Sequence, residues 1–527
     1  MRLLLLLLFT AGVLVAGIAQ VPSDAQVYDD LEMLRVAGLV RAMPPTSRPW
    51  TRAQVGRLVF EADSLSRGRV LAPGLRSALA RVSREYQEYL MRDGGYGRPR
   101  QPILDLPVVP AGPQARFRAD LFSRAGLSRP GDEILGYGSV GAVLENRPGD
   151  NFAFYERAEF TLYRPDTIEV SHADSGRYVP GTRVHAWKDG LGTFQIDHAW
   201  LAFRLPWQLR LTIGRDKYRW GPGYTGAVIL GDETPALDHV ALTADYGSFR
   251  FQTLTAYLSR WEEKHRFASW QRVELALWER LRLGGVLANV YAWDSLQTLS
   301  FFGMMNPLIP IYIEVAGSGH GDNLLVGWDA VFDLAPFQLY GALLLDNYEF
   351  IKRPQVPNAT ATQVGGRWVP NLPFELRAEY VGIAPFTYYH RIHHVMYENF
   401  GMPMGHGLGP DADLVDVRLG LLPLESIRFD LYGRQTRRGW YNRGDVRRKS
   451  WIPGQDTVPR SFPFEYEAEE YGRVECELRL GLEARYRPHR DLCVLGDFSW
   501  RRRENADGKL DNTLAGLGLG LRAEYRY

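Results

Sequence analysis

The pattern of hydrophobic and polar positions divides the chain into three parts. Residues 1–19 are mostly apolar after a basic start, and residues 22–95 carry apolar positions at helical spacing. From about residue 105 onwards, apolar and polar residues alternate one by one. Helical spacing predicts α-helices, and alternation predicts half-buried β-strands. We therefore expect a signal peptide over residues 1–19, a helical bundle over 20–100 and a β domain over 101–527.

The first segment has the layout of a secretory signal peptide. Arg2 precedes an apolar core, and the small side chains of Gly17 and Ala19 suit a signal peptidase. We expect cleavage after Ala19. An uncleaved membrane anchor is the alternative, but the apolar stretch is barely long enough to span a bilayer.

Three amphipathic helices are expected in the second segment. Ser23 is expected to cap the first helix and Thr51 the second, and the third follows Pro73. Such apolar stripes need a cover, so we expect the helices to pack against one another or over the mouth of the neighbouring domain. The apolar positions are Val27, Leu31, Leu34 and Leu39; Val55, Leu58 and Val59; and Leu75, Leu79, Val82, Tyr86, Tyr89 and Leu90.

The clearest strand is the last one. Leu517, Leu519 and Leu521 alternate there with glycines, so one face is apolar and the other lacks side chains. The chain stops at Tyr527, and this aromatic ending resembles the C-terminal signal of bacterial outer-membrane barrels. Similar alternation predicts strands within residues 209–213, 376–380, 427–431, 474–480 and 482–486.

The polar faces of these strands are full of charges, which favours a membrane barrel over a soluble sandwich. The apolar face of an outer-membrane barrel meets lipid, and its charged face lines a wet lumen. We therefore expect an all-β transmembrane barrel of about 18 antiparallel strands with a small N-terminal α-helical bundle. Polar stretches rich in Gly and Pro at residues 172–189, 352–370 and 436–465 are expected to be long loops.

Composition agrees with a barrel and argues against one class of partner. Aromatic residues make up 12% of the chain and there are 53 glycines, as expected for aromatic girdles and many turns. The 62 basic residues nearly balance the 61 acidic ones, so charge gives no reason to expect nucleic acid as a partner. Cys476 and Cys493 can form a disulfide in a secreted protein or remain free thiols.

A sharp turn at residues 214–223 is the most unusual local sequence. Two glycines flank Pro222, and cations and a tryptophan stand beside it. An aromatic face can cover a sugar ring while charged side chains bond its hydroxyls. The candidate polysaccharide contacts here are Arg215, Asp216, Arg219 and Trp220. The alternative is a structural turn with an interfacial tryptophan and lumenal ion pairs.

Histidines and aspartates gather further along the chain. His390 and His394 are four residues apart, which joins two metal ligands on a helix but separates them by about 13 Å on a strand. We therefore expect no metal site and no cofactor, and name His406, Asp411 and Asp413 as further polysaccharide contacts. No Gly-x-Ser-x-Gly motif is present, so we do not expect an enzyme.

These features together resemble the capsule assembly protein Wzi family. The resemblance rests on the order and spacing of several short pieces: Val21-Pro22 with Asp29-Asp30-Leu31, Trp50, the 214–223 turn, Asn306-Pro307 with Asp322-Asn323, Asp346, and Gly405-His406 to Asp413. It implies a large outer-membrane barrel whose helical N-terminal bundle closes the periplasmic end, with a lectin-like role.

The expected function is to bind an exported capsular or other surface polysaccharide and attach it to the bacterial cell. Outer-membrane lipid and, during biogenesis, the barrel assembly machinery are further expected partners. A porin or substrate channel in the outer membrane is the alternative, because it also uses a charged lumen. A helical bundle packed against the periplasmic mouth would block current, whereas a porin needs an open path.

Overall fold

The computed structural model describes most of the chain. The described residues are 18–90, 103–107, 116–130, 135–147, 151–164, 182–187, 190–293, 323–347, 359–390, 392–439, 442, 474–489, 491–506 and 512–526. Asn306, Pro307, Asp322 and the terminal Tyr527 lie outside them, so the predictions made on these positions remain predictions. Among the described residues, no helix is both long and apolar enough to span a membrane.

Three helices form the N-terminal unit: α2 (Val27–Val36), α3 (Arg52–Ser66) and α4 (Pro73–Glu85). Their apolar stripes pack on one another around the buried Trp50. Thr51 caps α3 as predicted, in a reciprocal pair of hydrogen bonds with Gln54. The prediction for Ser23 is wrong, because α2 begins after Gln26 and no side chain caps it.

Eighteen long antiparallel strands close into a barrel, as predicted. The last strand pairs with the first and completes the ring. Two short strands, β2 (Leu104–Pro107) and β6 (Thr182–Trp187), pair with parts of the long strands. The long strands are β3 (Arg116–Pro130), β4 (Leu135–Arg147), β5 (Phe152–Arg164), β7 (Gly190–Arg204), β8 (Leu209–Asp216), β10 (Leu237–Asp245), β11 (Phe249–Tyr257), β12 (His265–Leu277), β13 (Leu281–Trp293), β14 (Asn323–Leu334), β15 (Phe337–Asn347), β16 (Ala359–Trp368), β17 (Phe374–Ile383), β20 (Ala412–Leu424), β21 (Ile427–Arg438), β22 (Glu475–His489), β23 (Leu492–Glu504) and β24 (Leu514–Arg526).

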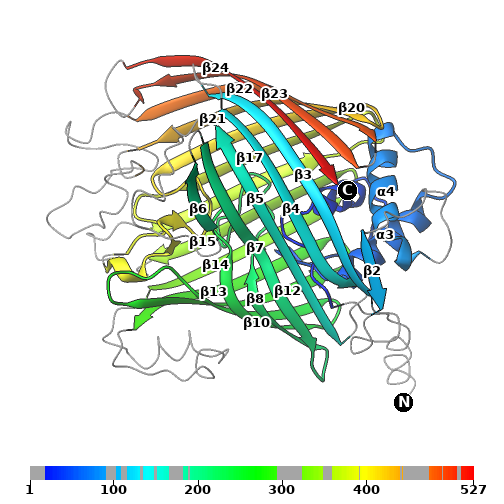
Figure 1. Cartoon of the computed structure of the whole chain (residues 1–527), viewed down its shortest axis with the longest axis horizontal. Helices are drawn as coiled ribbons and strands as arrows, with labels where there is room; N and C mark the ends of the chain where they lie inside the picture. Colours follow the sequence, from blue (N-terminus) through cyan, green and yellow to red (C-terminus); the bar gives the residue numbers. More distant parts are fainter. Residues whose placement is uncertain are drawn as a thin grey trace.

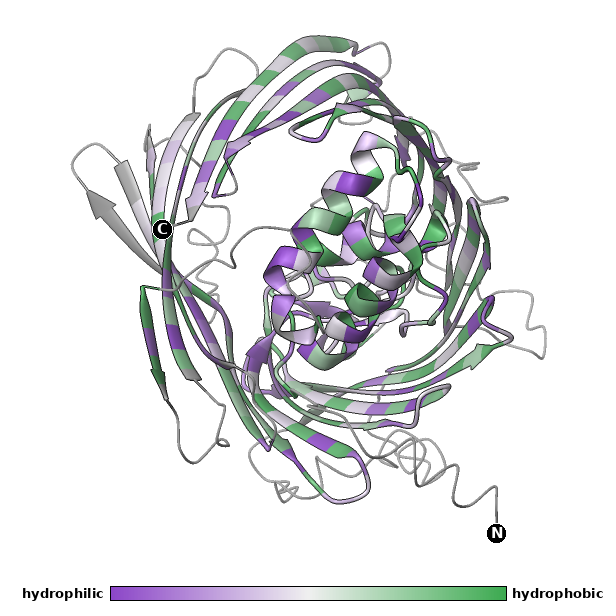
Figure 2. Ribbon diagram, turned by 90° about the vertical axis from the view of Figure 1, so that its right-hand side faces the viewer, coloured by the Kyte–Doolittle hydropathy of each residue, from purple (hydrophilic) through white to green (hydrophobic). Residues whose placement is uncertain are grey.

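The barrel has two distinct ends. Helices α3 and α4 lie at one of them, which we call the helical end (Figure 1). There Ser77 of α4 donates a hydrogen bond to the carbonyl of Glu425, in the short turn between β20 and β21, at 2.7 Å. Seen from this end, the helices lie within the ring of strands (Figure 2). We call the opposite end the loop end.

Alternation sorts the wall residues onto an outer and an inner face. On β24, Leu517, Leu519 and Leu521 are each more than half exposed and face outwards, where lipid would cover them. Cys476 shares this outer face on β22, whereas Cys493 pairs in register with the inward Glu524. Both thiols are free, because they point to opposite sides of the wall.

Two segments between strands fold into the barrel. Residues 217–236 follow β8, and the described residues of the range 384–411 follow β17. Tyr397 of the second segment donates to the carbonyl of Ile229 in the first at 2.6 Å, and receives a hydrogen bond from Trp270 of β12 at 2.8 Å. One apolar cluster therefore joins both segments to the inner wall. The prediction of a single loop over residues 352–370 is wrong, because β16 occupies most of it.

Candidate binding site

The chain before α3 is fixed to the inner wall by buried carboxylates. Glu274 accepts hydrogen bonds from the backbone amides of Thr46 and Ser47 at 3.0 and 3.1 Å. Asp329 accepts one from the Thr46 hydroxyl at 2.7 Å. Arg272 pairs with both carboxylates, at 2.5 Å for Glu274 and 2.7 Å for Asp329. The helical unit is thereby held against strands β12 and β14.

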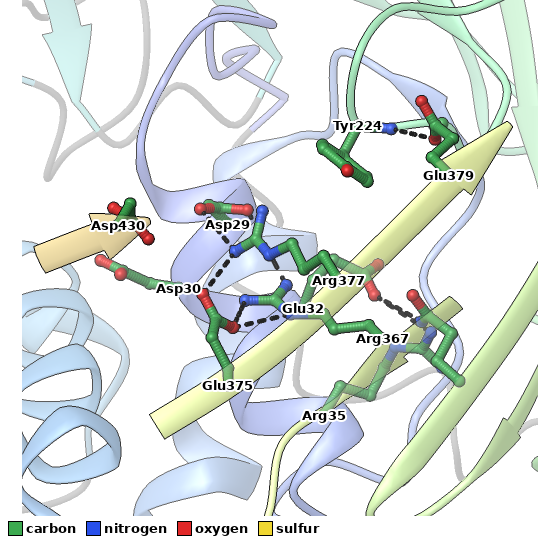
Figure 3. Close-up of polar contacts among 12 residues, drawn as sticks. Asp29, Asp30, Glu32, Arg35, Tyr224, Arg367, Glu375, Arg377, Glu379 and Asp430 are labelled. Atoms are coloured by element: carbon green, nitrogen blue, oxygen red, sulfur yellow. Dashed lines mark hydrogen bonds and ion pairs between the residues drawn. The ribbon is translucent and has the colours of Figure 1, made fainter. Parts of the chain in front are cut away.

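Helix α2 is fixed to the wall by charges (Figure 3). Asp29 lies 3.1 Å from Arg377 and 3.8 Å from Arg367, and Glu375 pairs with the same two arginines. Enclosure inside the barrel opposes ionisation of Asp29, but Arg377 and Arg367 outweigh it and hold the pKa of this carboxyl well below its usual range. These contacts place the start of α2 beside the inner faces of β16 and β17.

Residues 214–216 of the predicted turn belong to the end of strand β8, and residues 217–223 lie inside the barrel. Strand β9 (Arg219–Trp220) pairs with β1 (Ser47–Arg48), so the turn is joined to the helical unit. The Trp220 indole is fully buried in the apolar cluster and has no free face for a sugar ring. Arg219 instead lines open space, and its guanidinium donates to the carbonyl of Gly226 at 3.3 Å.

His406 links the two inward segments. The Leu408 amide donates to His406 Nδ1 at 3.1 Å, so Nε2 carries the proton and donates to the Thr225 hydroxyl, also at 3.1 Å. That hydroxyl in turn donates to Glu379 on β17. Burial and the nearby charges of Arg219 and Arg434 lower the pKa of His406 to about 3. The imidazole is therefore neutral at physiological pH.

A cavity of about 520 Å³ lies between α2, the 217–236 segment and the inner wall. Tyr224, Tyr340 and Gln338 line it together with many charged side chains. The eight arginines are Arg48, Arg219, Arg282, Arg367, Arg377, Arg418, Arg434 and Arg485, and the four carboxylates are Asp24, Asp29, Glu32 and Asp232. Guanidinium, phenol and amide groups all bond sugar hydroxyls, and the excess of arginine favours a ligand that carries negative charge.

Two of the predicted contacts on β8 do not reach this cavity. Arg215 lies on the outer face with the exposed Ile213 and pairs with Asp238 at 2.6 Å. Asp216 points inwards but is fully buried, with its carboxylate 2.6 Å from His198 Nδ1. Arg219 is therefore the predicted residue of this turn that lines the cavity among the described residues.

The predicted aspartates at the start of β20 are also engaged elsewhere. Asp411 is fully buried, and its backbone amide donates to the carbonyl of Ala384 at 3.3 Å. Asp413 shares the outer face with the exposed Val415 and accepts a hydrogen bond from Arg437 at 2.9 Å. The structure thus brings Arg219 and His406 to one region, and places the two aspartates outside it.

Most of the cavity residues were not among the predicted contacts. Arg377, Arg418 and Arg434 sit at polar positions of alternating strands, so alternation places them on the lumenal face. It does not say which lumenal residues meet. Arg48 carried no signal, because its position depends on the pairing of β1 with β9, more than 150 residues away.

The fold is similar to that of known outer-membrane proteins. Wzi, an outer membrane protein involved in group 1 capsule assembly in Escherichia coli, matches with a TM-score of 0.61 and 15% identity, over 96% of this chain and 99% of that one. Wzi is a carbohydrate-binding β-barrel. This match confirms the fold that the resemblance implied.

Two barrels of Pseudomonas aeruginosa are also similar in part. OccD3 (OpdP) matches with a TM-score of 0.45 and 10% identity, over 78% of this chain and 91% of that one. OprD matches with a TM-score of 0.43 and 12% identity, over 78% and 95%. No protein-family model matches the sequence, and no curated protein matches it.

Proposed function

We propose that this protein binds an exported surface polysaccharide in the outer membrane and attaches it to the cell, without catalysing a reaction. The observation that supports this most is the similarity to the carbohydrate-binding Wzi barrel over nearly the whole of both chains. The helical unit is included in that span, and it forms one side of a polar cavity inside the barrel. Lipid around the apolar outer face and the barrel assembly machinery are further proposed partners.

Deletion of the gene in its native host tests this role. The polysaccharide should still be made, while its cell-attached fraction falls and the released fraction rises. Both fractions are measured by quantitative staining after gentle centrifugation, and the wild-type gene on a plasmid should restore attachment. An unchanged attached fraction in the deletion strain contradicts the proposal.

A substrate channel is the second candidate, and one part of the wall supports it. Arg124, Glu159 and Glu524 form an ion-paired group on the inner face of β3, β5 and β24, and each side chain remains about a fifth exposed. Side chains on this part of the wall are thus less covered than the buried apolar cluster against β10–β17. Single-channel recordings in planar bilayers decide the matter: a steady ion conductance favours a channel, and its absence favours an attachment protein.

A further inference from the structure

An unusual row of like charges crosses the inner wall. Arg434 of β21 lies directly opposite Arg479 of β22, which lies directly opposite Arg501 of β23. We call these three residues the arginine row. Only Arg434 at one end has an acidic partner among the described residues, Asp416 at 2.7 Å. Arg479 donates to the Ser499 hydroxyl at 3.2 Å.

Other charged side chains on this wall contact groups of opposite charge. Nearer the loop end, Glu475 lies within 3.2 Å of both Arg438 and Arg503. Nearer the helical end, Arg428 pairs with Asp430 at 2.7 Å. Like charges directly opposite each other destabilise a sheet. Asp430, Glu483 and Asp497 also face one another on the same three strands, but Asp430 pairs with Arg428, and Glu483 pairs with Arg418 at 3.4 Å. The arginine row differs because Arg479 and Arg501 have no acidic partner among the described residues.

A second like-charged pair faces the same space. Arg434 also lines the cavity, and so do Arg48 and Arg219, which lie directly opposite each other in the β1–β9 pair. The Arg48 guanidinium stacks over the Tyr28 ring at 4.4 Å and forms no ion pair with a described carboxylate. Arg219 pairs with Asp232 at 3.7 Å. The arginine row and the Arg48–Arg219 pair are therefore joined through one cavity, which Arg434, Arg48 and Arg219 line together.

We propose that the arginine row and the Arg48–Arg219 pair bind the acidic groups of a polysaccharide, so that the ligand is an anionic polymer and not a neutral one. This rests on the proposed function, and names the chemical class of its ligand. The planar guanidinium group binds carboxylate and phosphodiester oxygens with two parallel hydrogen bonds. Successive acidic groups along one chain would contact the row and the pair in turn.

Calorimetric titration of the detergent-purified barrel tests this. The probes are hexagalacturonate, which carries carboxylates, a glycerol-phosphate hexamer, which carries phosphodiesters, and the neutral maltohexaose. At low salt we expect at least one acidic probe to bind about tenfold or more tightly than the neutral one, and to weaken as salt rises. The acidic probe that binds more tightly identifies the group. Neutral and acidic probes of equal affinity would overturn the proposal.

The double variant Arg479→Gln/Arg501→Gln should weaken binding of the acidic probe about tenfold. Arg501→Gln alone is the safer second variant, because Arg501 forms no ion pair with a described residue, and it should weaken binding in part. The matched control is Arg502→Gln, which removes the same charge from the outer face, where Arg502 pairs with Glu504 at 2.8 Å. Wild-type affinity in the double variant would overturn the proposal.

The attachment assay separates this inference from the proposed function. If deletion releases the polysaccharide but the double variant retains it, the arginine row is not the site while the attachment role stands. If deletion leaves attachment unchanged, the attachment role fails, and acidic-probe binding then reports an anion site in a protein of another function.

Discussion

At the scale of single residues, we expect His406 to make the packing of the inward segments against each other depend on pH. Its pKa is about 3 in the folded chain, whereas an exposed histidine has a pKa of about 6.5. Between these values the opened segment binds a proton that the closed one does not, so closure loses stability as the pH falls below about 6.5. The proton would go to Nδ1, the atom that accepts the Leu408 amide hydrogen bond.

We therefore expect hydrogen exchange of the amides in residues 400–411, corrected for intrinsic rates, to rise up to about thirtyfold between pH 7 and pH 5. His406→Gln should flatten this dependence, because an amide side chain does not titrate in that range. Exchange in α3 serves as the internal control. Equal pH dependence in the wild type and the variant would show that another group controls opening.

The residue types in the sequence were a better guide to the fold than to the residues that line the site. Trp220 was predicted to be a sugar platform because it stands beside a sharp turn, yet it is fully buried. Its burial depends on residues such as Leu254 and Tyr397, which come from β11 and the second inward segment. Local sequence contains no information on such distant packing. Arg219 was named because a charged side chain beside a sharp turn can bond sugar hydroxyls, and the same reasoning named Arg215, which lies on the outer face.

At the scale of elements, the alternation of apolar and polar residues was sufficient to predict the strands. It was insufficient to predict the segments that fold inwards. The strands expected around residues 209–213 and 427–431 are parts of β8 and β21, because lipid outside and a polar lumen inside impose a strict period of two. Residues 227–230 are a short apolar run, which has the same appearance in a strand and in an inward loop. These residues are buried because they pack against the inner wall, and the pattern of their own sequence does not predict this.

The cap of α3 gives a prediction on this scale. Thr51→Ala removes the side chain that accepts the Gln54 amide, and should lower the free energy of opening α3 by about 1 kcal/mol. Hydrogen exchange of residues 52–66 measures this. Thr51→Ser keeps the hydroxyl and should stay close to the wild type. A loss of the same size in both variants would mean that the methyl group, and not the cap, stabilises the helix start.

At the scale of the whole molecule, net charge and local charge point to different ligands. The formal net charge is +1, which gave no reason to expect nucleic acid as a partner. The barrel nevertheless gathers eight arginines and four carboxylates around one cavity. Composition averages over the outer face, the lumen and the loops, so it loses the distribution that matters to a ligand inside the barrel.

The positions of the two cysteines allow the orientation of the barrel in the cell to be read directly. Cys476 lies at the loop end of β22, where its neighbours on the outer face, Arg437 and Glu504, are charged and lie beyond the apolar band. Cys493 follows the turn after β22 at the helical end. If the loop end faces the medium, a membrane-impermeant maleimide added to intact cells should label Cys476 and spare Cys493, with Cys476→Ser as the control. The reverse pattern would place the helices outside the cell. One mass spectrum of the labelled protein therefore shows whether the loop end or the helical end of the barrel faces the medium.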